Sequence, residues 1–321
     1  MPAATIVITT KNRRDDLREA LTTAVRQTAD VEVLVIIDGS SDGSSEMVRS
    51  EFPQVVLRRS EVSRGLIVQR NVAAAVATAP IIVSIDDDAR LPSERTVAQA
   101  LADFDHPRVG AVAMPYIDTR RNPGAQRQVA PDPDGVWVTS SYIGTAHALR
   151  RDLFLALGGY REHLRHMTEE PDYCLRMLAA GYVTRLGRSD VLHHLESPQR
   201  IYARNVRLGR RNEILHGWHN VPMPYLVGRW AKVIAHSLWL TTRWRALPAG
   251  LRGLAAGLLD AYRYRRLREP VARSVYRIDH AIRKRGPLRV EEIEGRLPPA
   301  LPLATGHQRS VEPVNRANAA S

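Results

Sequence analysis

The stretch Ile81-Ile82-Val83-Ser84-Ile85-Asp86-Asp87-Asp88 decides the fold of this chain. Its apolar, mostly β-branched run is typical of a buried strand in a parallel sheet. Three adjacent carboxylates repel one another, and their position at the end of that strand is best explained by a bound cation. Hard divalent ions such as Mg²⁺ and Mn²⁺ prefer oxygen ligands, and they commonly bridge carboxylates and phosphates. Because ligands of open α/β sheets bind at the carboxyl ends of strands, the stretch predicts a metal-bridged diphosphate site. The alternative interpretation is a solvated acidic turn.

Strand-like and helix-like segments alternate through the first part of the chain. The patterns predict strands at 5–9, 31–37, 54–58, 81–85 and 109–114, with helices at 14–27, 43–51, 66–78 and 93–103. Residues 115–135 are predicted to be a loop, followed by a strand at 136–143, helices at 151–157 and 170–180, and short strands at 182–186 and 190–194. Such alternation predicts an α/β fold in which helices flank a mostly parallel sheet.

The composition is that of a globular protein with a strong basic excess. The 321 residues carry a net charge of +12, and nearly all of the positive charge is arginine. Because aromatic residues make up only 6%, no stacking platform is apparent, and nucleic-acid binding is not expected. The single cysteine, Cys174, excludes an internal disulfide and is predicted to be a core residue in a reducing cytoplasm. The start of the chain leads directly into a strand, so no signal peptide is expected, and no apolar stretch predicts a spanning helix.

The last third of the chain changes in character. Two basic amphipathic helices are predicted at 229–245 and 251–267. They either pack against the main domain or lie on an anionic membrane surface. The sequence from 286 to 321 is rich in Pro and Ala and is predicted to be a disordered tail.

A second carboxylate is predicted to lie at the same edge of the sheet as the acidic triplet. Asp38 ends the strand at 31–37, where it can accept a hydrogen bond from a base N–H or a ribose hydroxyl; simple turn chemistry is the alternative. The chain has neither G-x-G-x-x-G nor G-x-x-x-x-G-K-[ST], so phosphates would be neutralised by a metal ion and by arginine. Arg70 in the helix at 66–78 is the candidate arginine, and an ordinary helix-surface charge is the alternative.

Together these segments resemble the nucleotide-sugar-binding half of family 2 glycosyltransferases, which have the GT-A fold. The resemblance rests on four segments, Ile6 to Arg13, Ile37 to Gly43, Arg64-Gly65 with Arg70-Asn71, and Asp86 to Asp88. It continues into an acceptor half through Gly144 to Arg151, Leu157 to Tyr160, Thr168 to Arg176 and Val191 to His194. It implies a nucleotide-binding half at 1–115, an acceptor and base half of the same domain at 116–196, and a helical extension at 197–285.

The resemblance also implies roles for individual residues. The nucleotide sugar would be held by Thr9, Thr10, Asn12, Arg13, Asp38, Arg70, Asp86 and Asp87. Asp88 would bind a divalent cation, Mn²⁺ or Mg²⁺, and His194 is the first choice for a further ligand, with His193 second. Because successive strand residues point to opposite faces, one of the two histidines is expected to reach the site. The catalytic base would be Glu170, with Glu169 second, in a segment where the family often has Glu-Asp.

The expected reaction is an inverting transfer of one sugar from a nucleoside-diphosphate sugar to a hydroxyl acceptor. The Gln-x-x-Arg-Trp pattern of processive synthases is missing, because Leu226 stands where Gln would be needed before Arg229-Trp230. Two alternatives stay open, a sugar nucleotidyltransferase and an inactive protein of the same fold at a membrane surface. The expected location is the cytoplasm, at the inner face of the membrane if residues 229–285 make a peripheral contact.

Overall fold

The computed structural model describes residues 1–120, 123–195, 202–243 and 247–303. Its strands are β1 (Ala4–Thr10), β2 (Val31–Asp38), β3 (Val56–Ser60), β4 (Ile81–Asp86), β5 (Ala89–Arg90), β6 (Val109–Ala113), β7 (Tyr116–Asp118), β8 (Gln126–Arg127), β9 (Trp137–Thr139), β10 (Ala146–Arg150), β11 (Val183–Leu186), β12 (Leu192–His194) and β13 (Leu288–Arg289). Its α-helices are α1 (Arg14–Ala24), α2 (Ser44–Glu51), α3 (Leu66–Val76), α4 (Thr96–Ala102), α5 (Arg151–Ala156), α6 (Glu169–Ala179), α7 (Tyr202–Asn220), α8 (Tyr225–Arg243), α9 (Leu247–Arg263) and α10 (Arg273–Arg285).

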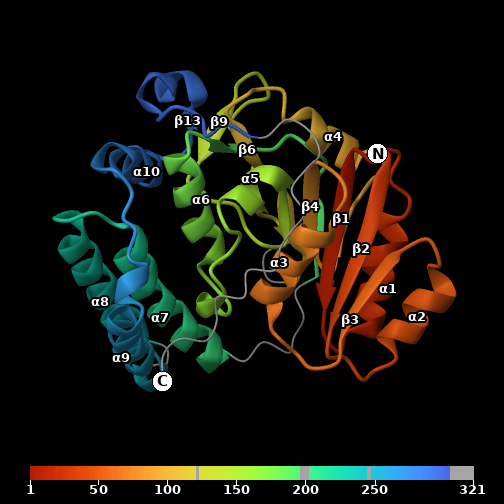
Figure 1. Ribbon diagram of the computed structural model, residues 1–321, viewed down its shortest axis with the longest axis horizontal. Helices are drawn as coiled ribbons and strands as arrows, with labels where there is room; N and C mark the ends of the chain where they lie inside the picture. Colours follow the sequence, from red (N-terminus) through yellow and green to blue (C-terminus); the bar gives the residue numbers. More distant parts are fainter. Residues whose placement is uncertain (121–122, 196–201, 244–246, 304–321) are drawn as a thin grey trace.

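Within the described residues, one large sheet organises the molecule (Figure 1). Its nine strands follow the order β13-β9-β11-β6-β10-β4-β1-β2-β3. The strands β4, β1, β2 and β3 are parallel neighbours, whereas β10 runs antiparallel between β4 and β6. The prediction of an α/β fold with a flanked sheet and a helical extension is confirmed.

Both faces of the large sheet are covered, which explains why its central strands are apolar throughout. Ile6 and Ile8 of β1 pack in a core that includes residues of α1, α2 and α4. Val7, between them in sequence, packs in a second core with residues of α3 and α5. Alternate residues of one strand thus enter different cores, as the two-residue period of a strand requires.

A small second sheet replaces part of the predicted 115–135 loop. Its strand order is β5-β12-β7-β8. β12 pairs in parallel with β7 and antiparallel with β5, which directly follows the acidic triplet. The strands β7 and β8 are only three and two residues long, too short to leave a periodic pattern in the sequence. This sheet matters because it carries β12 to the edge where the predicted site lies.

The helices α7, α8 and α9 form a group on the side of the molecule away from β1–β3 (Figure 1). α9 packs on α7 through two small residues, Gly253 and Gly257. A Cβ added at Gly253 would lie 2.5 Å from the carbonyl oxygen of Arg207, so the two helices approach closely. In the described part of the chain, none of the helices combines the length and the apolar character needed to cross a membrane.

The prediction of a disordered tail from residue 286 is wrong for residues 286–303. β13 adds to the edge of the large sheet by pairing with β9, and Val290 and Ile293 are fully buried. Further along, the Leu301 amide donates to the Ala180 carbonyl over 2.9 Å. A few apolar side chains inside a Pro-rich segment are enough to dock it, because the sheet edge supplies the backbone hydrogen bonds. The rest of the predicted tail, 304–321, lies outside the described residues.

Candidate active site

The carboxyl ends of β1, β2 and β4 meet at one edge of the large sheet. β1 lies between the other two strands, with Thr9 paired to Asp86 and Thr10 paired to Ile37. Asp38 is the last residue of β2. The register therefore sets these predicted site residues along one edge, as parallel neighbours require.

Asp87, the middle member of the acidic triplet, is turned into the protein. Thr10 Oγ1 donates to Asp87 Oδ2 over 2.7 Å, and Arg13 Nη1 donates to Asp87 Oδ1 over 2.7 Å. Burial raises the pKa of Asp87 to about 7, although Arg13 and the Thr10 hydrogen bond oppose the shift. Asp87 thus ties the end of β1 and the loop after it to the end of β4, and Arg13 Nη1 also donates to Asp88 Oδ2 over 3.1 Å.

Asp88 lies against His194, which comes from the small sheet. His194 Nε2 is 3.3 Å from Asp88 Oδ1, and His194 Nδ1 donates to Asp118 Oδ1 over 2.6 Å. Burial by itself would lower the pKa of His194, but its hydrogen bonds to Asp88 and Asp118 raise it to about 9. The side chain of His193, by contrast, is exposed on the other face of β12. The cluster therefore contains His194, and the second-choice ligand His193 does not reach it.

Asp86, Asp88 and His194 form a donor set suited to a divalent cation. One ligand atom from each lies within 4.8 Å of the others. Two carboxylates and one imidazole suit Mn²⁺, whereas Mg²⁺ prefers oxygen ligands alone. Asp118 holds the imidazole through Nδ1, the arrangement that commonly orients a metal-binding histidine. The residues at this edge therefore fit the cation that the acidic triplet predicts.

Arg70 links this cluster to the glutamate pair. Its side chain is 5% exposed, and Nη2 donates to Asp86 Oδ1 over 2.8 Å and to the Gly144 carbonyl over 3.0 Å. Nη1 lies 3.7 Å from Glu170 Oε1. Burial would lower the pKa of Arg70, but Asp86 and the nearby glutamates raise it, so the guanidinium stays charged. The alternative of a helix-surface charge is therefore wrong for Arg70.

Glu169 and Glu170 begin helix α6, and they occupy different environments. Glu169 is 1% exposed, and burial together with the charge of Glu170 raises its pKa to about 8. Burial also raises the pKa of Glu170, although Arg70 opposes the shift. Glu170 is the more exposed of the two, at 15% of its side chain, and it faces Arg70. Burial thus favours the protonated form of both carboxyls, and Arg70 opposes this effect at Glu170, the more accessible of the two.

The loop that leads into these glutamates is held in an unusual backbone conformation. Arg165, Met167 and Thr168 all have positive φ, which is costly for residues with a Cβ. Asn212 of α7 is fully buried, and its Nδ2 donates to the carbonyls of Leu164, His166 and Met167 over 2.7 to 2.8 Å. One side chain from the helical extension therefore anchors the approach to the glutamates.

Asp38 uses its carboxylate to shape the loop between β3 and α3. It accepts hydrogen bonds from Gln69 Nε2 at 2.6 Å and, in the loop, from Ser63 Oγ at 2.7 Å and the amides of Arg64 and Gly65 at 2.7 and 2.9 Å. Burial would raise the pKa of Asp38, but these hydrogen bonds lower it below its usual range. In this conformation Asp38 is a backbone organiser at the predicted nucleotide edge.

Asn12 performs a similar task on the other side of β2. Its amide donates to Ser40 Oγ, and its Oδ1 accepts from the Ser41 amide, each over 2.9 Å. Its φ of 51° places it in the left-handed region, which asparagine tolerates better than most residues. The loops after β1 and β2 are thereby fixed to each other beside the acidic triplet.

Comparison with known proteins agrees with this geometry. Residues 5–159 match the family model described as glycosyl transferase family 2. The chain carries a family 2 glycosyltransferase domain. The matched segment contains β1 to β10, so it includes the acidic triplet, Asp38 and Arg70, while the glutamates and His194 follow it. The predicted assignment to glycosyltransferases of family 2 is confirmed.

Two curated relatives are similar in sequence to parts of this chain. The O-antigen chain rhamnosyltransferase WbaN of Salmonella anatum is 26% identical over 229 residues, 65% of this chain and 72% of that protein. The succinoglycan biosynthesis protein ExoU of Rhizobium meliloti (strain 1021) is 34% identical over 197 residues. That match covers 55% of this chain and 57% of the relative.

Solved structures share the fold. The mannosyltransferase PcManGT from Pyrobaculum calidifontis, in complex with GDP-Man and Mn²⁺, superposes with a TM-score of 0.54 at 24% identity, over 83% of this chain and 79% of that one. S. aureus TarS 1–349, in complex with UDP-GlcNAc, has a TM-score of 0.60 at 16% identity, over 88% of this chain and 87% of that one. At these identities the likeness concerns the fold, and it agrees with the predicted GT-A architecture.

Two residues of the site escaped sequence reasoning. Asp118, which orients His194, lies in the segment predicted to be a loop, and Asn212 lies in a helix whose polar side chains carry no pattern. Neither has a local signal, because each acts on a segment more than 40 residues away in sequence. A prediction that residues 116–118 form a strand paired with the strand of His194 would have pointed to Asp118.

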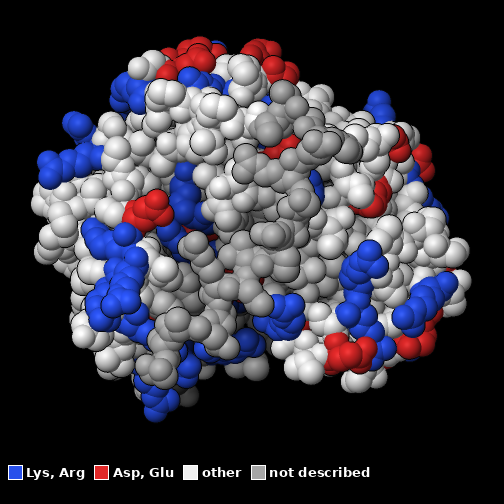
Figure 2. All heavy atoms as spheres, viewed as in Figure 1, with Lys and Arg blue, Asp and Glu red and all other residues white. Residues whose placement is uncertain are grey.

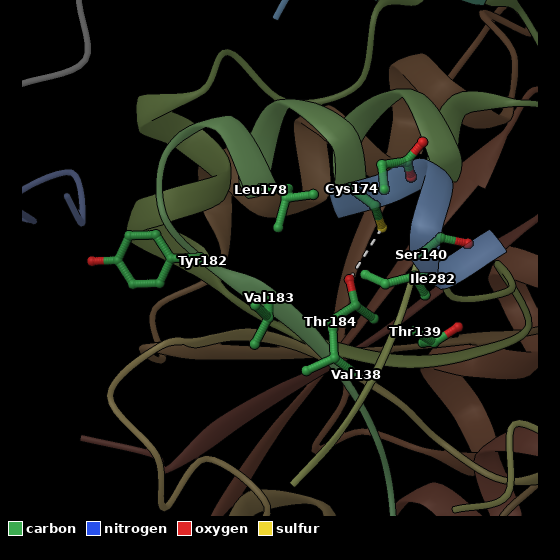
Figure 3. Close-up of a pocket in the computed structure, with 10 residues that line it drawn as sticks. Val138, Thr139, Ser140, Cys174, Leu178, Tyr182, Val183, Thr184 and Ile282 are labelled. Atoms are coloured by element: carbon green, nitrogen blue, oxygen red, sulfur yellow. Dashed lines mark hydrogen bonds between the residues drawn. The ribbon is translucent and has the colours of Figure 1, made fainter. Parts of the chain in front are cut away.

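A small cavity elsewhere in the family 2 glycosyltransferase contains none of the predicted site residues. It lies among β9, β11, α6 and α10, and Figure 3 shows Cys174 at its wall, with Thr184 Oγ1 donating to Cys174 Sγ over 3.4 Å. Burial raises the pKa of the Cys174 thiol to about 11, so it stays protonated at neutral pH. Cys174 is the core residue that its sequence context predicts.

Proposed function

We propose that this protein transfers one sugar from a nucleoside-diphosphate sugar to a hydroxyl acceptor, with a divalent cation and with inversion at the anomeric carbon. The observation that carries the proposal is the continuous chain of contacts from the cation cluster through Arg70 to Glu170. A leaving-group site and a base site thus stand side by side at one edge of the sheet. The two solved neighbours bind GDP-Man and UDP-GlcNAc, which supports a nucleotide sugar as the donor class.

The donor side is assigned to the ends of β1, β2 and β4. Asp86, Asp88 and His194 would hold the cation, which when bound supplies positive charge to the diphosphate. Thr9 and Thr10 end β1, and Asn12 and Arg13 follow in the next loop. Asp38 fixes the loop before α3, so the nucleotide would lie between these two loops. Asp87 holds this arrangement together through Thr10 and Arg13.

The acceptor side is assigned to the start of α6. Glu170 accepts the proton of the acceptor hydroxyl while the new bond from that oxygen to the anomeric carbon forms. The bond from the anomeric carbon to the diphosphate oxygen breaks, and its electron pair leaves with the nucleoside diphosphate. Attack from the side opposite the leaving group inverts the configuration. Because burial raises the basicity of Glu170, general-base help of about 10² to 10⁴-fold is expected.

A panel of UDP-, GDP- and dTDP-sugars tests the proposal. Calorimetry with and without Mn²⁺ should find metal-dependent binding of one donor class, and Asp88→Ala should abolish that dependence. Glu170→Gln should bind the donor as the wild type does while losing turnover, because only proton acceptance is removed. Near-wild-type turnover of Glu170→Gln would move the base to Glu169. Binding of nucleoside triphosphates with release of pyrophosphate would favour a nucleotidyltransferase, and absence of any nucleotide binding would favour an inactive scaffold.

A further inference from the structure

Helices α8 and α9 each present an exposed apolar stripe of the same spacing. The stripe residues recur at i, i+4, i+7 and i+11, which is one helix face, and are Val227, Ala231, Ile234 and Leu238 on α8 and Leu251, Ala255, Leu258 and Tyr262 on α9. Trp239 and Leu259 lie beside the stripes and are 57% and 72% exposed. Most of the large hydrophobic side chains that are exposed in the described residues lie in this part of the chain, between 223 and 267.

These stripes are separate from the faces that hold the helices in the fold. The glycine face of α9 is in contact with α7, where a Cβ added at Gly257 would lie 2.8 Å from Ile214 Cβ. On α8, Leu226 and Val233 are buried, and Trp230 Nε1 donates to the Ile214 carbonyl over 3.1 Å. Both helices are therefore fully attached through their inner faces. Rows of exposed apolar side chains on outer helix faces are typical of an interaction site.

The same region has an almost uniform charge. Asp260 is the sole acidic residue in the sequence from 223 to 267, and it is paired with Arg211 over 2.6 Å. The basic residues of that stretch are Arg229, Lys232, Arg243, Arg245, Arg252, Arg263, Arg265 and Arg266. Arg252 and Arg263 on α9, and Arg266 just after its end, are exposed and lie beside the apolar stripe. Figure 2 shows basic side chains gathered at the lower left, where Figure 1 places α9.

We propose that the α8–α9 face, defined by these two stripes and their flanking basic residues, docks on a membrane surface that bears anionic phospholipids. Apolar side chains beside exposed arginines fit the boundary between acyl chains and negatively charged headgroups. A second copy of this chain would bring two basic rims together, which is repulsive. A nucleic acid would match the charge but would leave the apolar stripes in water. The inference does not depend on the transfer reaction, because no residue of the active site belongs to this face.

Co-sedimentation of the full chain with vesicles tests the inference. The protein should bind vesicles of phosphatidylcholine and phosphatidylglycerol, bind phosphatidylcholine alone at least tenfold less, and release at high salt, because the attraction to the headgroups is screened. Leu259→Asp and Arg252→Glu should each weaken binding by about tenfold or more. Both residues are exposed, so neither substitution removes a core contact.

Matched controls come from exposed residues on other helices. Val76→Asp at the end of α3 and Arg49→Glu on α2 carry the same chemical changes and should bind vesicles as the wild type does. Asp88→Ala should also bind normally, which separates docking from failure of the proposed reaction. Wild-type binding by Leu259→Asp and Arg252→Glu, or equal affinity for neutral vesicles, would overturn the inference. So would a dimer in light scattering that Leu259→Asp dissociates, because the face would then be a contact between copies.

Discussion

Gly144 lies against both Arg70 and Glu170, and a single methyl group there should disturb both. An ideal Cβ at this position lies 2.5 Å from Glu170 Oε1, 2.7 Å from Arg70 Nη1 and 3.1 Å from Arg70 Nη2. Gly144 does not have a positive φ, so alanine is compatible with the backbone there. The effect of Gly144→Ala therefore arises from steric contact with Arg70 and Glu170 alone.

The expected magnitude follows from these distances. Ordinary contacts of a Cβ begin at about 3.4 Å, so the Glu170 carboxylate must move by roughly 0.9 Å or the segment must shift. A displacement of about 1 Å at a reacting group costs about 10²-fold in rate. We therefore expect Gly144→Ala to lower kcat about a hundredfold. Overpacking should lower the free energy of unfolding by about 1 to 3 kcal/mol.

Steady-state kinetics with the donor and acceptor identified by screening measure this effect. Donor affinity should fall as well, because Arg70, which donates to Asp86 of the cation cluster, must also move. Gly228→Ala on α8 is the matched control, since a Cβ there meets nothing within 4 Å. A kcat of Gly144→Ala within about threefold of the wild type would refute the reasoning, because it would mean that the Arg70–Glu170 contact is dispensable.

Three further predictions follow from other contacts. Asp118→Asn should weaken Mn²⁺ binding by about 10- to 100-fold, because His194 loses the carboxylate that orients it. Calorimetry measures this affinity, and an unchanged value would mean that His194 is not a ligand of the cation. The folded-state pKa of Glu169, about 8, lies above its unfolded value of 4.5, so the folded protein binds this proton more tightly and loses stability as the pH rises between those values. Glu169→Gln should therefore gain thermal stability over the wild type as the pH rises from 5 to 9, and a constant difference in Tm would contradict the burial argument. Asn212→Asp and Asn212→Ala should both lower kcat by about tenfold with unchanged donor binding, because each variant lacks the amide donors to the loop before α6. Wild-type turnover of either variant would show that the loop keeps its conformation without these hydrogen bonds.

The site was predicted most closely where one strand and the loop after it carry the information. The runs that end at Asp38 and Asp86 predict both strands and the edge at which they end, because parallel neighbours share that edge. The local pattern does not reveal the direction of each side chain. Asp87 turns inward because Thr10 and Arg13, more than 70 residues earlier, supply its hydrogen bonds. The Asp38 carboxylate likewise accepts hydrogen bonds from the loop before α3, and the turn sequence that follows Asp38 does not indicate this contact.

The sequence by itself determined the alternation of strands and helices, the family resemblance and the position of the acidic triplet. Each of these depends on short contiguous stretches of residues. Only the tertiary structure placed His194, and not His193, beside Asp86 and Asp88, through the pairing of β12 with β5 and β7, and only it brought Glu170 close to Arg70. It also docked residues 286–303 on the large sheet. The physical reason is the same in each case. Strand pairing and side-chain burial depend on partners far away in the sequence, so the spacing of apolar residues within one segment does not predict them.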